Sequence, residues 1–208
     1  MAEHDSQTKP SRWTIRWLAV LLLAPVGTLA ARPLLVLQFF HSDDGLDHLL
    51  RLFALDRTLR QGVVYPRWLF ALAYGYGYPI FNYYPPLAAY VAEMLRLLGL
   101  GLVEAIRGTG VICVFAAILG AYALGAEFFH DTKHASTAGI LTAVAYVFFP
   151  YFLIDIYVRG AIAEVLAAAI LPWLVWAARR GERLRALDQN GHDLPNRQIE
   201  IAQFNAPG

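Results

Sequence analysis

Three long apolar stretches decide the fold of this chain: GTGVICVFAAILGAYALGAEFF (108–129), TAGILTAVAYVFFPYFLI (137–154) and AIAEVLAAAILPWLVWAA (161–178). Each has roughly the 20 residues that an α-helix needs to cross the hydrocarbon core of a bilayer. A fourth stretch, 14–37, is apolar over most of its length. The pattern predicts four membrane-spanning helices.

The composition favours the same class of protein. Of the 208 residues, 58% are hydrophobic and only 16% are charged, with a formal net charge of +1. Soluble domains are about half apolar and about a quarter charged. These values argue against a secreted disulfide-bonded domain, a disordered chain and a nucleic-acid-binding protein. The single cysteine, Cys113, lies in an apolar run and cannot form an intrachain disulfide. We therefore expect the lipid bilayer to be the main partner of the chain.

Basic residues beside the first and last spans predict the direction of the chain. Arg12 and Arg16 lie at the start of the first span. After the last span comes the strongest basic cluster of the chain, Arg179, Arg180, Arg183 and Arg185. Because basic flanks favour the cytoplasmic side, both ends of the chain are expected inside, and the number of crossings is even.

These observations predict an all-α fold, a polytopic transmembrane helical bundle with a juxtamembrane loop on its outer face. We expect a multi-pass protein of the cell (inner) membrane with a cytoplasmic N-terminus. Four parts are predicted: a polar tail 1–13, a membrane module 14–180, an outer loop 41–107 within it, and an irregular polar tail 187–208.

The stretch 85–102 is ambiguous, because it is apolar but carries Glu93 and Arg96 near its centre. If it crossed the membrane, one basic cluster would lie on the wrong side. We therefore predict a helix that lies on the outer face or dips in and out of the membrane, with Glu93 and Arg96 neutralising each other at i, i+3.

The segment HSDDGLDH (41–48) follows the first predicted span and brings carboxylates and histidines to one membrane interface. Helical spacing after it predicts an amphipathic helix with an apolar stripe made of Leu46, Leu49, Leu50 and Phe53. In one interpretation, Asp43 or Asp44 only caps this helix. In the other, a carboxylate here is a general base or binds a hard divalent cation through oxygen.

Aromatic residues are dense in GVVYPRW (62–68), YGYGYP (74–79) and FNYYPP (81–86). They suit an aromatic belt at the lipid headgroups. They also suit a binding surface, in which rings stack on sugars or isoprenoid chains and Arg67 pairs with a phosphate. The candidate stacking residues are Tyr65, Trp68, Tyr76 and Tyr78.

The segment DIYVRGAIAE (155–164) joins the last two predicted spans. Asp155 and Arg159 are spaced for an i, i+4 ion pair that closes a turn. Glu164 has no obvious local partner, and ionisable groups near the hydrocarbon are costly. Glu164 is therefore the best candidate for a buried acidic group with a function. The turn 130–134 is typical of a solvated loop rather than a metal site.

Three segments, in this order, resemble one known family: DDGLDHLLRLFALDRTLRQGVVYPRW (43–68), GYGYPIFNYYPPLAAY (75–90) and YVRGAIAEVLA (157–167). They are similar to the N-terminal part of bacterial membrane proteins described as 6-pyruvoyl-tetrahydropterin synthase-related, which look like GT-C-type polytopic glycosyltransferases. The resemblance covers roughly residues 14–180. It implies transfer of a sugar from a polyprenyl-phosphate donor, a lipid-linked sugar, at the outer face of the membrane.

The resemblance also implies roles for particular residues. An acidic residue in the first outer loop of such enzymes acts near the acceptor, often with a divalent cation such as Mg or Mn, and Asp43 and Asp44 match it. A second acidic residue follows the third span in many members, where Asp155 matches and Glu164 is the nearby alternative. Asp44 and Asp155 are thus the implied metal ligands. Two arginines would suit the donor phosphate, Arg67 and Arg159.

Family members are usually several times longer, so the resemblance implies that these 208 residues are a truncated N-terminal portion. Two other interpretations stay open. A non-catalytic structural or assembly subunit would dock a partner on the aromatic loop and use its carboxylates as helix caps. A transporter fragment would place charges at mid-membrane, which Glu93 and Arg96 weakly suggest.

Overall fold

The computed structural model describes residues 12–35 and 42–204, and side chains within 18–35 and 42–186. Over these residues the chain is all-helical, apart from one isolated bridge between Leu69 and Tyr78. Residues 1–11 of the predicted tail and 36–37 of the first predicted span lie outside this part. The longer helices are α1 (Arg12–Leu35), α2 (Gly45–Arg60), α3 (Leu87–Leu97), α4 (Leu102–Phe128), α5 (Ala135–Val147) and α7 (Ile162–Phe204). The short elements are the 3-10 turns η1 (Ala73–Gly75) and η2 (Ile80–Asn82), helix α6 (Pro150–Ile154) and the π-helical turn η3 (Asp155–Arg159).

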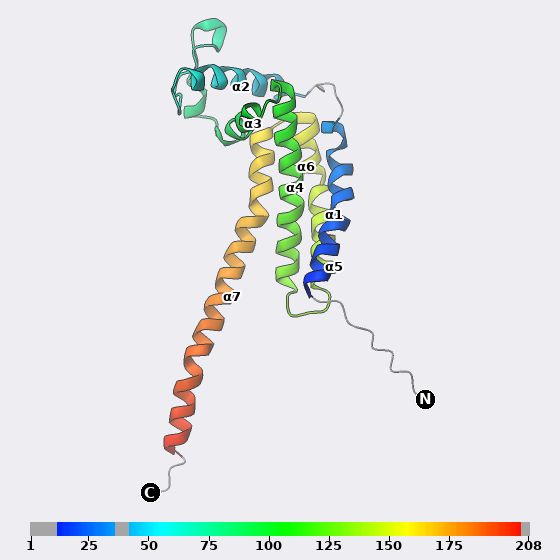
Figure 1. Cartoon of the computed structure of the whole chain (residues 1–208), viewed down its shortest axis with the longest axis vertical. Helices are drawn as coiled ribbons and strands as arrows, with labels where there is room; N and C mark the ends of the chain where they lie inside the picture. The colour runs from blue at the N-terminus through cyan, green and yellow to red at the C-terminus, as the bar shows by residue number, and fades with distance from the viewer. Residues whose placement is uncertain (1–11, 36–41, 205–208) are drawn as a thin grey trace, which may run out of the picture.

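The helices are arranged in two groups (Figure 1). Helix α4 packs against α1, α5 and α7, which run beside it, while α2 and α3 lie across one end. We call this end the α2–α3 end, and we call the opposite end, which carries the link 129–134 between α4 and α5, the turn end. Helix α7 continues beyond the turn end as a single rod. The connection between α2 and α3 projects from the α2–α3 end, away from the other helices.

Two helices are long and apolar enough to cross a membrane: α4 and the part Ile162–Ala186 of α7. A third candidate is α5 taken together with Pro150–Arg159, a pair that is bent by 45°. The apolar part Leu21–Leu35 of α1 is shorter than a span. The chain therefore has two or three candidate membrane spans over its described residues and is a membrane protein.

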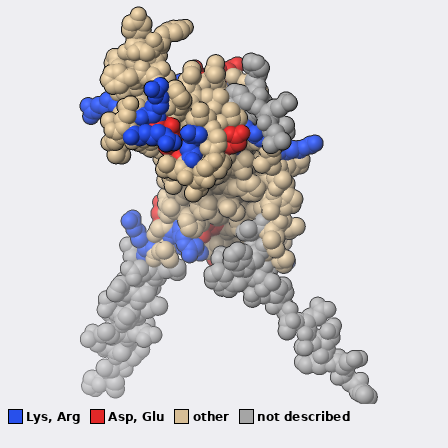
Figure 2. All heavy atoms as spheres, turned by 45° about the horizontal axis from the view of Figure 1, so that its top comes forward, with Lys and Arg blue, Asp and Glu red and all other residues tan. Residues whose placement is uncertain are grey.

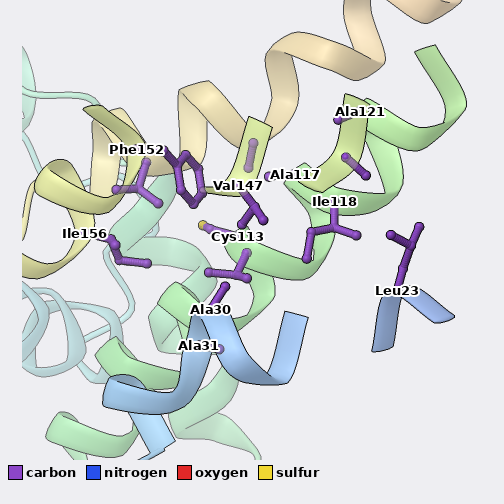
Figure 3. Close-up of a cluster of buried hydrophobic side chains, with 14 of the residues drawn as sticks. Leu23, Ala30, Ala31, Cys113, Ala117, Ile118, Ala121, Val147, Phe152 and Ile156 are labelled. Carbon is purple, nitrogen blue, oxygen red and sulfur yellow. The ribbon is translucent and has the colours of Figure 1, made fainter. Parts of the chain in front are cut away.

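Small side chains let the long helices approach closely. The largest buried cluster joins α1, α4, α5, α6 and α7, with Cys113 and Ala117 of α4 facing Val147 of α5 (Figure 3). A Cβ atom on Gly139 would lie 2.7 Å from the Tyr122 ring and from its carbonyl oxygen. Small residues at helix contacts are typical in membranes, where association depends on close packing rather than on the hydrophobic effect.

A neighbouring helix supplies the hydrogen bond that one proline in the apolar layer removes from α7. Pro172 lies inside α7 and has no N–H, so the carbonyl of Ala168 loses its usual intrahelical partner. The Tyr146 hydroxyl donates a hydrogen bond to that carbonyl at 2.7 Å. One residue after the proline, the Trp173 indole donates to the carbonyl of Ala116 at 2.9 Å and joins α7 to α4. Polar backbone groups in hydrocarbon require such partners.

Helix α2 buries a different face from the one that the sequence predicts. Leu46, Leu50 and Phe53 of the predicted apolar stripe are exposed, whereas His48 and Leu52 are buried. The reason is that α2 has apolar residues on two faces. The face containing Leu52 packs with α3, α4 and α7 and includes Leu49 of the predicted stripe, while the other three residues of the stripe remain on the outside of the protein.

The predicted pairing of Glu93 with Arg96 is replaced by contacts with α2. Arg96 lies 3.6 Å from Asp56, whose carboxylate also accepts a hydrogen bond from Arg60 at 3.0 Å. Burial raises the pKa of Glu93, while the Arg60 hydrogen bond lowers the pKa of Asp56. Of these two neighbouring carboxyl groups, Glu93 is therefore the one whose protonation is favoured. This contact fastens α3, which has only 11 residues and is too short to cross a bilayer.

The polar tail 187–208 also differs from the prediction, because α7 remains helical to Phe204. The sequence after Leu187 has no long apolar period and contains a glycine and a proline, which favour an irregular end. Extension of an existing helix gains one hydrogen bond for each residue that is fixed, without a new nucleation cost. Continuation from the apolar part of α7 is therefore easier than formation of a separate helix.

Candidate functional site

The acidic loop before α2 lies directly against the turn before α7. The amide of Asp43 donates to the carbonyl of Val158 at 3.1 Å, and the amide of Asp44 donates to that of Arg159 at 2.7 Å. Gly160 ends η3 with a φ of +67°, and a Cβ atom there would lie 2.5 Å from the Ser42 hydroxyl. A left-handed glycine thus permits both the turn and the close approach of the two segments. The structure brings together two regions that are more than 100 residues apart in the sequence.

Arg159 is held between two carboxylates. Its Nη1 donates to Asp155 Oδ1 at 2.5 Å and to Glu164 Oε2 at 2.7 Å, and its Nη2 donates to Glu164 Oε1 at 2.7 Å. The predicted Asp155–Arg159 pair is confirmed. The expectation for Glu164 was wrong in two respects. Glu164 has Arg159 as a bidentate partner, and its side chain is 48% exposed, whereas Asp155 is 2% exposed.

Asp155 is therefore the deeply buried acid of this set, and Glu164 is the accessible one. The reason is helical geometry, because η3 turns Asp155 inward while Glu164 starts α7 at its rim. The Tyr151 hydroxyl also donates to Glu164, at 3.3 Å. A carboxylate with two partners and an open side can be displaced more easily than one that is enclosed.

Three residues that the sequence analysis did not select lie beside this set. The His48 ring nitrogen Nε2 lies 3.5 Å from the Tyr84 hydroxyl, and the guanidinium of Arg51 lies 4.1 Å above the Tyr84 ring. Arg51 also lies 3.6 Å from Asp47. The nearby charges that act on Tyr84 include Asp44 and Glu164. Tyr84 therefore contacts α2 and lies within the electrostatic influence of the acidic loop and of the start of α7.

Burial sets the protonation of this group. Burial, and then the nearby Arg51, lower the pKa of His48 to about 4, so the imidazole is neutral at pH 7. Burial also raises the pKa of Tyr84, which therefore keeps its proton. A sequence signal for these residues existed, because His48 and Arg51 flank the acidic loop on one helix. That signal becomes informative only when the buried face of α2 is known.

Asp44 occupies the N-cap position of α2, but its side chain makes no capping hydrogen bond. The simpler of the two interpretations, in which an aspartate side chain caps α2, therefore does not hold for Asp44. Asp43 is exposed and Asp44 half-buried, so both carboxylates can be reached from outside. Among the described residues, no three acidic, histidine or cysteine side chains converge as metal ligands.

The aromatic candidates lie on the projecting connection between α2 and α3. Tyr65, Trp68, Tyr76 and Tyr78 are all exposed, and the Trp68 ring covers Gly77. Arg67 is exposed as well, and in the described part of the chain no contact joins it to Arg159 or Asp44. The structure thus unites Asp43, Asp44, Asp155, Arg159 and Glu164. It places Arg67 and the four aromatic rings on a separate projection.

A scan against protein-family models finds no match to the chain. Searches of the curated proteins and of the solved structures find no significant match either. The chemistry of the site therefore has to be argued from its own geometry.

Arg107 is a further buried charge near this site that sequence reasoning missed. Its Nε donates at 2.7 Å to the carbonyl of Leu34, one of the free carbonyls at the end of α1. A cavity of about 20 Å³ adjoins it, which is room for about one water molecule. The cavity is lined by Leu34, Ser42, Gly45, Ile106, Arg107, Ile156, Gly160 and Ile162. Arg107 thus binds the end of α1 and lines the cavity that Ser42 and Gly45, beside the acidic loop, also line.

Chemically, the site offers accessible carboxylates next to a guanidinium that is already oriented. Accessible carboxylates can accept a proton, and an oriented guanidinium can bind a phosphate in place of a carboxylate. Both groups lie at one end of the candidate membrane spans, where the head of a lipid-linked molecule would also lie.

Proposed function

We propose that this chain is a GT-C-like polytopic membrane protein that transfers a sugar from a polyprenyl-phosphate donor. In this proposal α1, α4, the bent pair α5–η3 and α7 cross the cell membrane, both termini are cytoplasmic, and the outer loop 41–107 lies on the outer face. The observation that carries the proposal is the docking of Asp43 and Asp44 on the carbonyls of Val158 and Arg159. That contact brings the backbone of these two aspartates against the backbone of Arg159, whose guanidinium is oriented by Asp155 and Glu164.

Asp44 is the proposed general base, with Asp43 as its neighbour. The oxygen of an acceptor hydroxyl forms a bond to the anomeric carbon of the sugar while the bond between that carbon and the phosphate oxygen breaks. The acceptor proton moves to the carboxylate of Asp44, and polyprenyl phosphate leaves with the electron pair. A positioned base of this kind contributes about 10²–10⁴-fold to a rate.

Arg159 is the proposed phosphate contact, and Glu164 is the group that gives way to the phosphate. Asp155 holds one side of the guanidinium from a buried position, so Arg159 stays oriented when Glu164 is displaced. An arginine suits this role because its planar fork binds carboxylate and phosphate in the same bidentate manner. Arg67 and the exposed rings of Tyr65, Trp68, Tyr76 and Tyr78 would meet the sugar or the isoprenoid chain. Asp155, one of the two metal ligands that the resemblance implies, is already bound by Arg159, so the proposed reaction uses no divalent cation.

The test uses membranes that contain the chain or its Asp44→Asn or Glu164→Gln variant, supplied with a radiolabelled polyprenyl-phosphate sugar. Release of free polyprenyl phosphate is measured. We expect Asp44→Asn to lower the rate by about 100-fold or more, because the base is lost. Asp131→Asn, an exposed acid at the turn end, is the matched control and should keep the wild-type rate. Equal release by the wild type and both site variants would overturn the proposal.

A second candidate function is a non-catalytic assembly subunit, and one observation favours it. The side chains of Tyr74, Tyr76 and Tyr83 are almost entirely exposed on the projecting connection. Exposed rings of this density are typical of a surface that docks a partner. For such a subunit, Tyr74→Ser with Tyr76→Ser would abolish co-purification of a partner, while Asp44→Asn would leave it intact. The reverse pattern, with lost turnover and unchanged assembly, supports the transferase.

A further inference from the structure

The turn end carries a second charged cluster, independent of the proposed transferase site. Glu127, near the end of α4, is only 7% exposed and faces two arginines of α7. Arg183 Nε lies 2.8 Å from Glu127 Oε1, and Arg180 Nη1 lies 3.7 Å from Oε2. The cluster joins the ends of the two helices that qualify as membrane spans.

Aromatic rings fix two of the arginines in place. The guanidinium of Arg179 lies 4.6 Å above the Phe128 ring, and that of Arg180 lies 5.6 Å from the Trp176 ring. Cation–π contacts of this kind orient a guanidinium without neutralising its charge. The arginines are therefore already in position for an anion.

A groove of about 290 Å³ opens between the two helix ends. Its lining consists of Glu127, His130, Arg179, Glu182, Arg183 and Ala186. At roughly 30 Å³ for each water molecule, the groove has room for about ten waters, which exceeds the size of one phosphate group. The lining holds Arg179 and Arg183 against Glu127 and Glu182, and Arg180 adds a further positive charge through its contact with Glu127. Glu127 is already engaged by Arg180 and Arg183.

The position of this groove indicates which class of anion it would bind. Figure 2 shows charged side chains gathered in two regions, one at the α2–α3 end and one where the described side chains of α7 stop. The apolar run of α7 ends at Ala178, directly before Arg179, so the groove lies at the depth where lipid headgroups begin. Basic pockets between membrane helices at this depth attract anionic headgroups.

We propose that this groove binds the headgroup of an anionic phospholipid, whose phosphate is held by Arg179 and Arg183. The phosphate accepts hydrogen bonds from both guanidinium groups, and the acyl chains follow the apolar surface of α4 and α7 toward the α2–α3 end. A free phosphate has the same charge but lacks these chains, so the proposal commits to the lipid.

The experiment measures lipid binding to the purified full chain by native mass spectrometry, with phosphatidylglycerol and phosphatidylcholine of equal chain length. We expect preferential retention of phosphatidylglycerol, reduced about fivefold by Arg179→Gln, because each basic residue near an anionic surface contributes by about that factor. Arg179→Lys should keep most of the preference. Arg57→Gln is the matched control, since Arg57 stacks on Phe53 at the opposite end of the molecule.

Two results would overturn the proposal. One is equal retention of both lipids by the wild-type chain. The other is displacement of phosphatidylglycerol by inorganic phosphate at equal concentration, which would identify a site for free anions. Arg179 is exposed, so Arg179→Gln should fold normally, and circular dichroism of each variant checks this. A preference that survives in folded Arg179→Gln also counts against the groove.

Discussion

The two ends of α7 carry ion clusters of inverted composition. At the α2–α3 end one arginine, Arg159, is held by two carboxylates. At the turn end one carboxylate, Glu127, is held by two arginines. Both clusters join α7 to another element, and in both the most buried member is an acid. The net charge of the three groups is therefore negative at the first end and positive at the second.

This inversion bears on the proposed orientation in the membrane. Basic residues beside a span favour the cytoplasmic side, so the proposed topology has the turn end inside and the α2–α3 end outside. The same charges separate the proposed tasks of the two ends. A surplus of carboxylates suits proton transfer from an acceptor, and a surplus of guanidinium groups suits a lipid phosphate.

The largest predicted effect is an all-or-none difference in chemical access. Tyr76→Cys at the α2–α3 end should react with a membrane-impermeant maleimide added to intact cells, whereas Lys133→Cys at the turn end should react only after lysis. The reason is that the candidate spans separate the two positions. Labelling is read by gel after purification of the chain.

The native thiol gives a low background in this experiment, since Cys113 is buried inside α4. The wild-type chain is therefore the control. Labelling of both positions from the same side would break the comparison, because the two clusters would then share one environment.

The next effect compares the two clusters by stability. Arg159→Met leaves the buried Asp155 without its partner, and loss of one member of a buried pair costs about 3–5 kcal/mol. Glu127→Gln removes the buried acid itself, and the side chains of Arg180 and Arg183, 43% and 29% exposed, can extend to water. We expect the smaller cost of a charged hydrogen bond, about 1.5–3 kcal/mol. Unfolding in detergent measures both values.

The double variant Asp155→Asn with Arg159→Met sharpens this prediction. Removing both members of the pair should recover much of the loss, because no buried charge is left unpaired. If Glu127→Gln were the more damaging single change, the arginines at the turn end would be as enclosed as Asp155. The two clusters would then be opposite in residue types but alike in burial.

The smallest effect concerns the neutral layer between the clusters. Tyr146→Phe leaves the carbonyl of Ala168 without its donor, and an unsatisfied buried acceptor costs about 1–3 kcal/mol. Pro172→Ala restores an N–H to α7, so the same tyrosine change should cost much less in that background. A cost of Tyr146→Phe that does not depend on Pro172 would show that the unsatisfied carbonyl of Ala168 is not its cause.

The apolar stretches could be predicted because length and hydrophobicity alone specify a buried helix. The stretches 108–129 and 161–178 each lie within α4 or α7 except for one terminal residue, and both helices extend beyond them, α4 toward Leu102 and α7 to Phe204. The bend between α5 and α6 was harder to foresee, although Pro150 marks it. The orientation of α2 could not be predicted. Apolar residues lie on both of its faces, and only the packing of Leu52 with α3 and α4 decides between them.

The site shows the same division between local and distant information. The Asp155–Arg159 pair follows from i, i+4 spacing on one helical turn. The partner of Glu164 was missed because Gly160 breaks the helix between Arg159 and Glu164, which removes the regular spacing. His48 and Tyr84 are 36 residues apart, and no local pattern connects them. Contacts of that kind depend on how α2 packs, which the sequence pattern left undecided.

Helix α7 has one mechanical consequence. Glu164 and Arg183 are nineteen residues apart on it, about 28 Å at 1.5 Å per residue, and each is clamped to a different neighbour. Between them, the Trp173 indole donates a hydrogen bond to α4. A rod that is clamped at both ends transmits torsion, because hydrocarbon does not allow its hydrogen bonds to open. In the proposed topology, a ligand that displaces Glu164 from Arg159 releases the outer of these two clamps and leaves α7 held at Trp173 and at Arg183.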